Sequence, residues 1–130
     1  MIQRIDNIGI AVRDVMREVR FFQEKLGLEP AWPVQKGATS AGIQCGNASL
    51  FMFKSESAGR HQKRTDQFTH NPPGIDHISL EVQNIETAGA ELEKRGVEFL
   101  GPIVGERGQF RYRGFPDPEG NMLYIIQTPG

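Results

Sequence analysis

The side chain best suited to chemistry in this sequence is the imidazole of His77, in the largely apolar stretch 74–82. Residue alternation there predicts a strand that places His77 on one face together with Ile75, Ser79 and Glu81. Such a histidine could bind a metal ion, exchange protons near neutral pH, or form a neutral hydrogen-bonding wall of a cavity. A zinc site needs about three or four protein ligands. The chemistry therefore depends on which side chains the fold brings to His77.

The stretch around His77 has an earlier copy at residues 5–12, displaced by 75 − 5 = 70 positions. The identical pairs are Ile5/Ile75, Asp6/Asp76, Ile8/Ile78 and Val12/Val82. Segments 24–29 and 93–98 also resemble each other, at an offset of 93 − 24 = 69. A repeat of this size indicates two similar halves, related by pseudo-symmetry, with a shared cavity between them. His77 stands where the first half has Asn7.

The composition is that of one soluble globular domain, residues 1–130, with 38% hydrophobic and 24% charged residues. The formal net charge of −1 gives no general attraction to nucleic acid or to anionic membranes, so neither is expected as a partner. No apolar run approaches the ~20 residues of a membrane span, and the N-terminus lacks a signal-peptide core. The single Cys45 cannot form an internal disulfide, which fits a cytoplasmic location.

Each half is expected to contain one helix and four strands. The helices are predicted at 15–26 and 84–95, where apolar residues recur at helical spacing after the caps Asp14 and Asn84. The predicted strands are 4–13, 28–35, 39–45 and 48–53, then 75–82, 97–104, 109–115 and 121–127. Prolines at positions 30 and 33 mark the second of these as an edge strand. The long polar segment 55–73 is expected to be a linker, or else a lid.

The sequence resembles the vicinal oxygen chelate superfamily, which includes glyoxalases, bleomycin resistance proteins and extradiol dioxygenases. The resemblance rests on two tandem βαβββ modules, the strand Ile75-Asp76-His77-Ile78, and the turn Asp117-Pro118-Glu119-Gly120-Asn121 before a last strand. It implies an α+β fold in which the two modules form a cup-shaped mixed β-sheet with the helices on the outside. Module one would span about 4–54 and module two about 74–127, joined by the linker 55–73. A homodimer is also implied.

The resemblance further implies where a metal would bind, namely on the first and last strands of each module. The first-strand positions are Asn7 and His77. The last-strand position of module two is Tyr124, where the family typically has a glutamate. Its counterpart in module one is Leu50 at an offset of 124 − 74 = 50, or Phe51 if the alignment slips by one residue. Only His77 is a good ligand for a divalent metal, so no cofactor is expected.

A divalent metal at His77 is the alternative. The loop histidines His61 and His70 could complete such a site if the loop folded inward.

Other side chains could line the implied cavity and bind a ligand. Met122 shares the face of Tyr124 on the last predicted strand. Arg111 and Arg113 share one face of another strand, where they could bind a carboxylate or phosphate if they faced the cavity. If they faced outward they would be solvated charges. Trp32 could stack on a planar ligand or belong to the core.

These residues support three functions. We expect a protein that binds a small organic molecule in the cavity between the modules, without a catalytic metal. One alternative is a glyoxalase-like lyase or isomerase, or a dioxygenase-related enzyme, with a reduced metal site at His77. The other is a metal-independent enzyme in which His77 and Tyr124 act as acid and base.

The ligand positions give the first testable prediction. The purified protein should carry no stoichiometric zinc, nickel, iron or manganese by elemental analysis, because Asn7, Leu50 and Tyr124 are poor or absent donors. A metal ion bound to each chain and lost in a His77→Ala variant would overturn this expectation.

Overall fold

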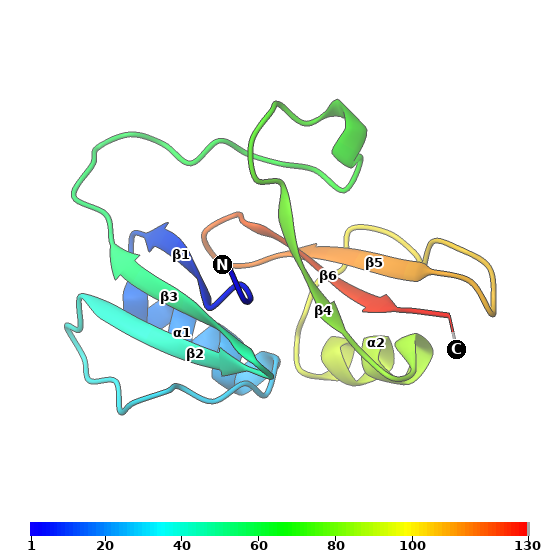
Figure 1. The fold of residues 1–130 in the computed structure, drawn as a ribbon, viewed down its shortest axis with the longest axis horizontal. Helices are drawn as coiled ribbons and strands as arrows, with labels where there is room; N and C mark the ends of the chain where they lie inside the picture. The colour runs from blue at the N-terminus through cyan, green and yellow to red at the C-terminus, as the bar shows by residue number, and fades with distance from the viewer. Residues whose placement is uncertain (130) are drawn as a thin grey trace. The chain divides into compact units, whose positions relative to one another are not determined.

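The structure, a computed structural model, describes residues 1–129. It contains two compact units, residues 1–60 and the chain from His61 onward (Figure 1). Each unit has one three-stranded sheet and one main helix, so the predicted α+β class with two repeated halves is confirmed. Within the described residues, no helix is long and apolar enough to cross a membrane.

The first unit is built from β1 (Asn7–Val12), α1 (Val15–Arg20), η1 (Phe21–Lys25), β2 (Ser40–Cys45) and β3 (Ala48–Lys54). The sheet order is β1-β3-β2, with β1 parallel and β2 antiparallel to β3. Helix α1 begins as predicted after Asp14, whose carboxylate accepts a hydrogen bond from the backbone N–H of Arg17. The π-helical turn η1 extends the helix to Lys25, and Gly27 follows with a φ of 72°.

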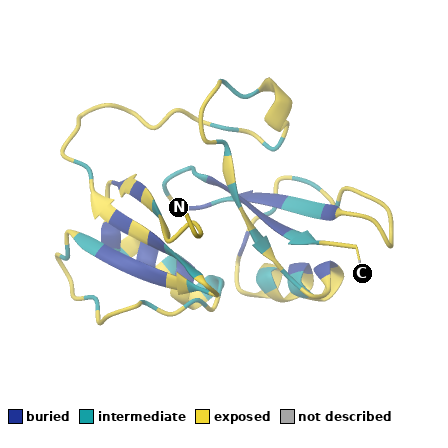
Figure 2. Ribbon diagram, in the orientation of Figure 1, coloured by how far each residue is buried: buried dark blue, intermediate teal, exposed yellow. Residues whose placement is uncertain are grey.

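One face of the first sheet packs against its helix. The buried side chains are Ile10, Val12, Ala41, Ile43, Leu50 and Met52 from the strands, and Val15, Val19 and Phe22 from the helix. Because side chains alternate along a strand, Phe51 and Phe53 lie on the other face and are exposed. Figure 2 shows this alternation of buried and exposed residues along β3. We call the face away from the helix of the same unit the open face.

The second unit repeats the plan with β4 (His77–Glu81), α2 (Ile85–Lys94), β5 (Arg111–Pro116) and β6 (Met122–Gln127). Its sheet order is β4-β6-β5. As in the first unit, the first strand, β4, is parallel to the last strand, β6, and β5 is antiparallel to β6. Asn84 caps α2 as predicted, accepting a hydrogen bond from the backbone N–H of Thr87. The topology therefore agrees with the repeat in the sequence.

The prediction of a second strand in each module, at 28–35 and 97–104, is wrong. Residues 28–35 form an isolated bridge, Pro30 with Ile43, and residues 97–104 form the bridge of Val104 with Tyr112 and one further backbone hydrogen bond, from Leu100 N–H to the Gly114 carbonyl. Proline has no N–H to continue a ladder, and both segments contain proline, at positions 30, 33 and 102. Within the described residues, each unit is therefore βαββ.

The segment 55–73, predicted as a linker or lid, is divided between the two units. Its first part stays with unit one, where the Arg13 guanidinium donates to the carbonyls of Ser57 and Gly59. Its second part, from His61, belongs to unit two and contains the 3-10 turn η2 (Phe68–His70).

An ion pair joins the helix face of the second sheet to α2. Arg111 on β5 is 7% exposed and binds Glu86 with both terminal nitrogens, at 2.7 and 3.0 Å. This bidentate hydrogen bonding stabilises the carboxylate and lowers the pKa of Glu86 to about 2.

This pair predicts how stability depends on pH. The pKa of Glu86 falls from 4.5 to about 2 in the fold, so its stabilisation is present above pH 4.5 and is lost as the pH falls towards 2. Thermal melts should show a steeper loss of Tm over this range for the wild type than for Glu86→Gln. The control is Glu91→Gln, which removes the surface pair with Arg95. Equal pH dependence of wild type and Glu86→Gln would contradict this role.

Candidate functional site

The open face of the second sheet carries the residues with chemical potential. His77 and Ser79 lie on β4, and in the sheet register Ser79 is opposite Tyr124 of β6, which is opposite Gly114 of β5. Alternation places Tyr112 and Ile126 on the same face. The strands of the second module thus bring His77 and Tyr124 together, with ring centroids 4.5 Å apart.

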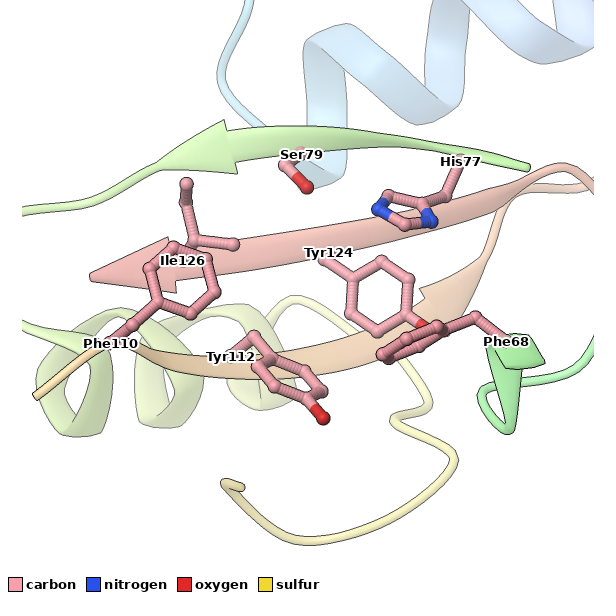
Figure 3. A pocket seen from close by; sticks show the side chains of 7 residues that line it. All are labelled: Phe68, His77, Ser79, Phe110, Tyr112, Tyr124 and Ile126. Atoms are coloured by element: carbon pink, nitrogen blue, oxygen red, sulfur yellow. The ribbon is translucent and has the colours of Figure 1, made fainter. Parts of the chain in front are cut away.

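These side chains surround a cavity of about 100 Å³. Its lining residues are Phe68, His77, Ser79, Phe110, Tyr112, Tyr124 and Ile126 (Figure 3). Neighbouring rings lie at edge-on or tilted angles with centroids 4.5 to 6.1 Å apart, the range that favours aromatic contact. The floor is the sheet, and Phe68 and Phe110 form a rim from segments outside it.

Gly114 allows the ring of Tyr124 to lie against the sheet. A Cβ at this position would come within 2.8 Å of the Tyr124 ring and 3.3 Å of the Met122 methyl group. The first unit has a glycine at the equivalent position, Gly42, opposite Phe51. There the ring of Trp32 occupies the space, 2.6 Å from where a Cβ would stand. Both sheets therefore use a glycine to seat an aromatic ring on the open face.

Tyr124 is a neutral phenol. Its side chain is almost fully buried, and its hydroxyl donates a long hydrogen bond of 3.4 Å to the carbonyl oxygen of Asp66. Burial, together with the charges of Asp76 and Asp66, raises the pKa of Tyr124 to about 12. A phenol that resists ionisation is a poor metal ligand and a weak proton donor near neutral pH.

Asp76 and His77 form a hydrogen-bonded pair beside this ring. Nδ1 of His77 lies 2.7 Å from Oδ2 of Asp76. Oδ1 of Asp76 accepts a hydrogen bond of 2.7 Å from the Asn71 amide and lies 3.6 Å from the Arg64 guanidinium. Burial opposes the charge on Asp76, but the hydrogen bonds from His77 and Asn71 and the positive charge of Arg64 outweigh it and lower its pKa.

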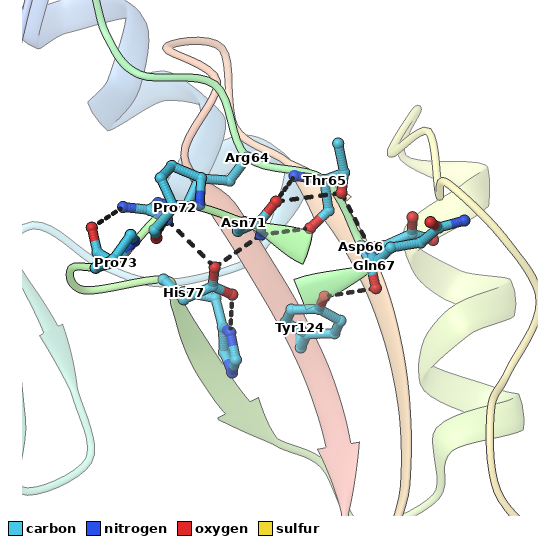
Figure 4. Close-up of polar contacts among 10 residues, drawn as sticks. Arg64, Thr65, Asp66, Gln67, Asn71, Pro72, Pro73, His77 and Tyr124 are labelled. Carbon is cyan, nitrogen blue, oxygen red and sulfur yellow. Dashed lines mark hydrogen bonds and ion pairs between the residues drawn. The ribbon is translucent and has the colours of Figure 1, made fainter. Parts of the chain in front are cut away.

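The segment before β4 holds this carboxylate in place. The Asn71 side chain accepts from Thr65 N–H and donates to the Thr65 carbonyl, closing a small loop around η2. Arg64 donates to the carbonyls of Pro72 and Pro73. Figure 4 draws these contacts with the hydrogen bond from Tyr124 to Asp66. The segment therefore both carries the rim residue Phe68 and fixes the partner of His77.

The residues present do not fit a metal site. Among residues 1–129, no three His, Cys, Asp or Glu side chains are grouped so that they could hold a metal ion. His61 bonds Asn121 at 2.7 Å instead, and His70 is exposed.

In module one the register favours Phe51 over Leu50 as the counterpart of Tyr124. Asn7 and His77 are equivalent, and they pair with Ser49 and Met122, which gives an offset of 122 − 49 = 73 and 124 − 73 = 51. The slip arises because the turn glycines that gave the offset of 74 are not equivalent: one residue separates Gly120 from Met122, whereas two separate Gly46 from Ser49. Leu50 is buried on the helix face.

The remaining predicted site residues lie outside the pocket. Asn7 and Trp32 belong to unit one, and Trp32 is 44% exposed and is not part of the core. Arg111 lies on the helix face, bound to Glu86, and Arg113 on the same face binds Glu93 and the Gly101 carbonyl. Met122 is buried on the open face next to Tyr124.

Several residues of the site were missed from the sequence. Alternation along the predicted strand places Asp76 on the face opposite His77, but β4 begins only at His77, so Asp76 precedes the strand and turns back to His77. Phe110 and Tyr112 alternate with Arg111 and Arg113 in the sequence, and alternation alone does not say which of the two sets faces the cavity. Phe68 lies in a segment without periodicity, where no signal pointed to it.

The fold and this site define a class of protein. The model of the Glyoxalase/Bleomycin resistance protein/Dioxygenase superfamily matches residues 4–125, and the chain belongs to that superfamily.

Individual relatives are distant. The virulence protein STM3117 of Salmonella typhimurium is 24% identical over 134 residues, covering 98% of this chain and 85% of that protein. A putative glyoxalase family protein from Bacillus anthracis superimposes with a TM-score of 0.73 at 20% identity, covering 98% of this chain and 97% of that one. The fosfomycin resistance protein FosX from Listeria monocytogenes gives 0.72 at 18% identity, covering 98% and 94%. Such structural likeness shows a shared fold.

The seating of Tyr124 on Gly114 gives a prediction. Gly114→Ala should lower the free energy of unfolding by about 1–3 kcal/mol in urea titrations, because the new methyl group forces the stiff ring to move. The loss should shrink in a Tyr124→Ala background, where the ring is absent. Gly9→Ala on β1 is the control, since its Cβ would meet Phe53 at an ordinary 3.6 Å. Equal tolerance at both glycines would contradict this account.

Proposed function

We propose that the protein binds a small, uncharged organic molecule in the pocket on the open face of the second sheet, using side chains rather than a catalytic metal. The observation that carries this proposal is the group of five ring side chains around one cavity. Small-molecule sites are mostly apolar with a few placed polar groups. Here the polar groups are the imidazole of His77 and the hydroxyls of Ser79 and Tyr112.

The charge of the lining supports an uncharged ligand. Among the residues that the structure describes, no Lys, Arg, Asp or Glu lines the pocket, and the nearby Arg64 and Asp76 face each other. A carboxylate or phosphate group would therefore lose its hydration without gaining a cation.

The size of the cavity limits what enters. Its volume of about 100 Å³ is below the roughly 150 Å³ of an engineered cavity that holds benzene. The pocket is open, since His77, Ser79 and Phe110 in its lining are exposed, so one ring would lie partly inside it and the rest of a ligand would extend over the rim. Phe68 and Phe110, which are 41% and 49% exposed, would contact that outer part.

A second candidate function rests on the contact of His77 with Asp76. An imidazole oriented by a carboxylate is the arrangement that general-base catalysis uses. In that case His77 would be the base that accepts a proton from the bound compound. Tyr124 would act through its ring, because its raised pKa keeps it protonated.

A fragment experiment tests the proposal. Uncharged single-ring compounds, titrated into isotope-labelled protein, should shift the amide signals of His77, Tyr112 and Tyr124, and Tyr124→Ala should abolish the effect. The matched control is Phe51→Ala, which removes the aromatic ring at the equivalent position of the other sheet. Thermal melts would verify that both variants fold.

Two outcomes would change the conclusion. Shifts that persist in Tyr124→Ala, or that map only to other surfaces, would refute binding in this pocket. Conversion of a bound compound that is lost in His77→Gln and kept in Tyr124→Phe would establish the second candidate.

A further inference from the structure

The carboxylate of Asp76 determines the hydrogen-bonding character of the pocket. Three groups hold it, namely the Asn71 amide, the Arg64 guanidinium and Nδ1 of His77. All three favour the ionised form, and an ionised carboxylate can only accept hydrogen bonds. Nδ1 of His77 must therefore carry the proton in its bond to Asp76, which assigns the tautomer of the ring.

The other nitrogen of His77 is then an acceptor. In the neutral imidazole Nε2 has a lone pair and no hydrogen. Within residues 1–129 it has no hydrogen-bond partner. Figure 4 draws the hydrogen bond of one ring nitrogen of His77, with the other nitrogen at the far side of the ring, and Figure 3 shows a ring nitrogen directed along the pocket towards Ser79.

The other polar groups of the pocket neither offer a second fixed acceptor nor donate a hydrogen bond to Nε2 of His77. The hydroxyl of Tyr124 is directed at the Asp66 carbonyl. The hydroxyls of Ser79 and Tyr112 can each donate or accept, so they adapt to a ligand and impose no requirement on it. The fixed requirement of the pocket is one hydrogen-bond donor, set among aromatic walls.

We propose that the pocket selects a planar aromatic compound with an O–H or N–H group that donates to Nε2 of His77, and that Asp76 is the positioning residue for this preference. The inference rests on the proposed function and specifies its ligand class. A phenol meets both conditions. Its methyl ether, anisole, has the same ring but no donor, and leaves Nε2 unsatisfied.

The inference is tested by which of the two compounds, phenol or anisole, binds more tightly. Affinities would be measured by following pocket amide signals, at a pH where the ring nitrogen signals of His77 report a neutral ring. Anisole is the more apolar compound, so a pocket without a fixed acceptor should prefer it. We expect the opposite, with phenol bound about threefold to tenfold more tightly.

Variants then test whether the preference for phenol over anisole depends on the pair Asp76 and His77. Asp76→Asn offers an amide that can donate to Nδ1, so the tautomer should reverse and the phenol preference should disappear. Ring nitrogen signals of His77 should show this reversal directly, which a general structural defect would not produce. His77→Phe keeps a ring but no nitrogen, and should retain anisole while losing the preference. The control is Asp6→Asn, because Asp6 occupies the equivalent place in unit one, where it binds Asn7 and Arg4.

Each result decides between the claims. If neither compound binds the pocket, the proposed function and the ligand class both fail. If both bind with anisole equal or tighter, the pocket stands and the ligand class is wrong. If phenol is preferred equally by wild type and Asp76→Asn, the positioning role of Asp76 is refuted.

Discussion

The parallel pairing of the first and last strand in each unit is the constraint on which the site depends. In the second unit it places β4 beside β6, so residues 47 positions apart, His77 and Tyr124, come into ring contact. A parallel pair cannot be closed by a tight turn, and the connection must pass over one face of the sheet, in part as a helix. Helix α2 lies on that face and buries it, which leaves the opposite face for a ligand.

The character of the site also depends on the charged residues around it, because none of the described residues that line the pocket is a Lys, Arg, Asp or Glu. Arg111 and Arg113 are held on the helix face by Glu86 and Glu93, and Arg64 is held by Asp76 and backbone carbonyls. The lining is therefore apolar with a small number of dipoles. The Tyr124 hydroxyl is directed at the Asp66 carbonyl, whereas the imidazole of His77 keeps one nitrogen for a ligand while a carboxylate that precedes the strand fixes its other nitrogen.

The sequence was sufficient for the repeat, the helix caps and the class of fold, because apolar periodicity and capping residues are local signals. The caps Asp14 and Asn84 were predicted correctly. The second strands were not, since a proline-containing segment can lie beside a sheet with only one bridge. The match of Tyr124 to module one slipped by one residue, because the similar Gly-Asn pairs of the two turns stand at different distances from the strands that follow. Asp76 and Phe68 became visible only in three dimensions, since neither lies in a strand.

The glycine beneath Tyr124 divides the pocket into parts that can evolve separately. Because the ring rests on backbone, the depth of the pocket is set by the sheet and changes only with disruption of its packing. Its mouth is formed by Phe68 and Phe110, which stand on connecting segments, where substitutions are tolerated. Proteins with this arrangement can therefore acquire new ligands of different length or shape by exchange at the mouth, while the stability of the sheet is preserved.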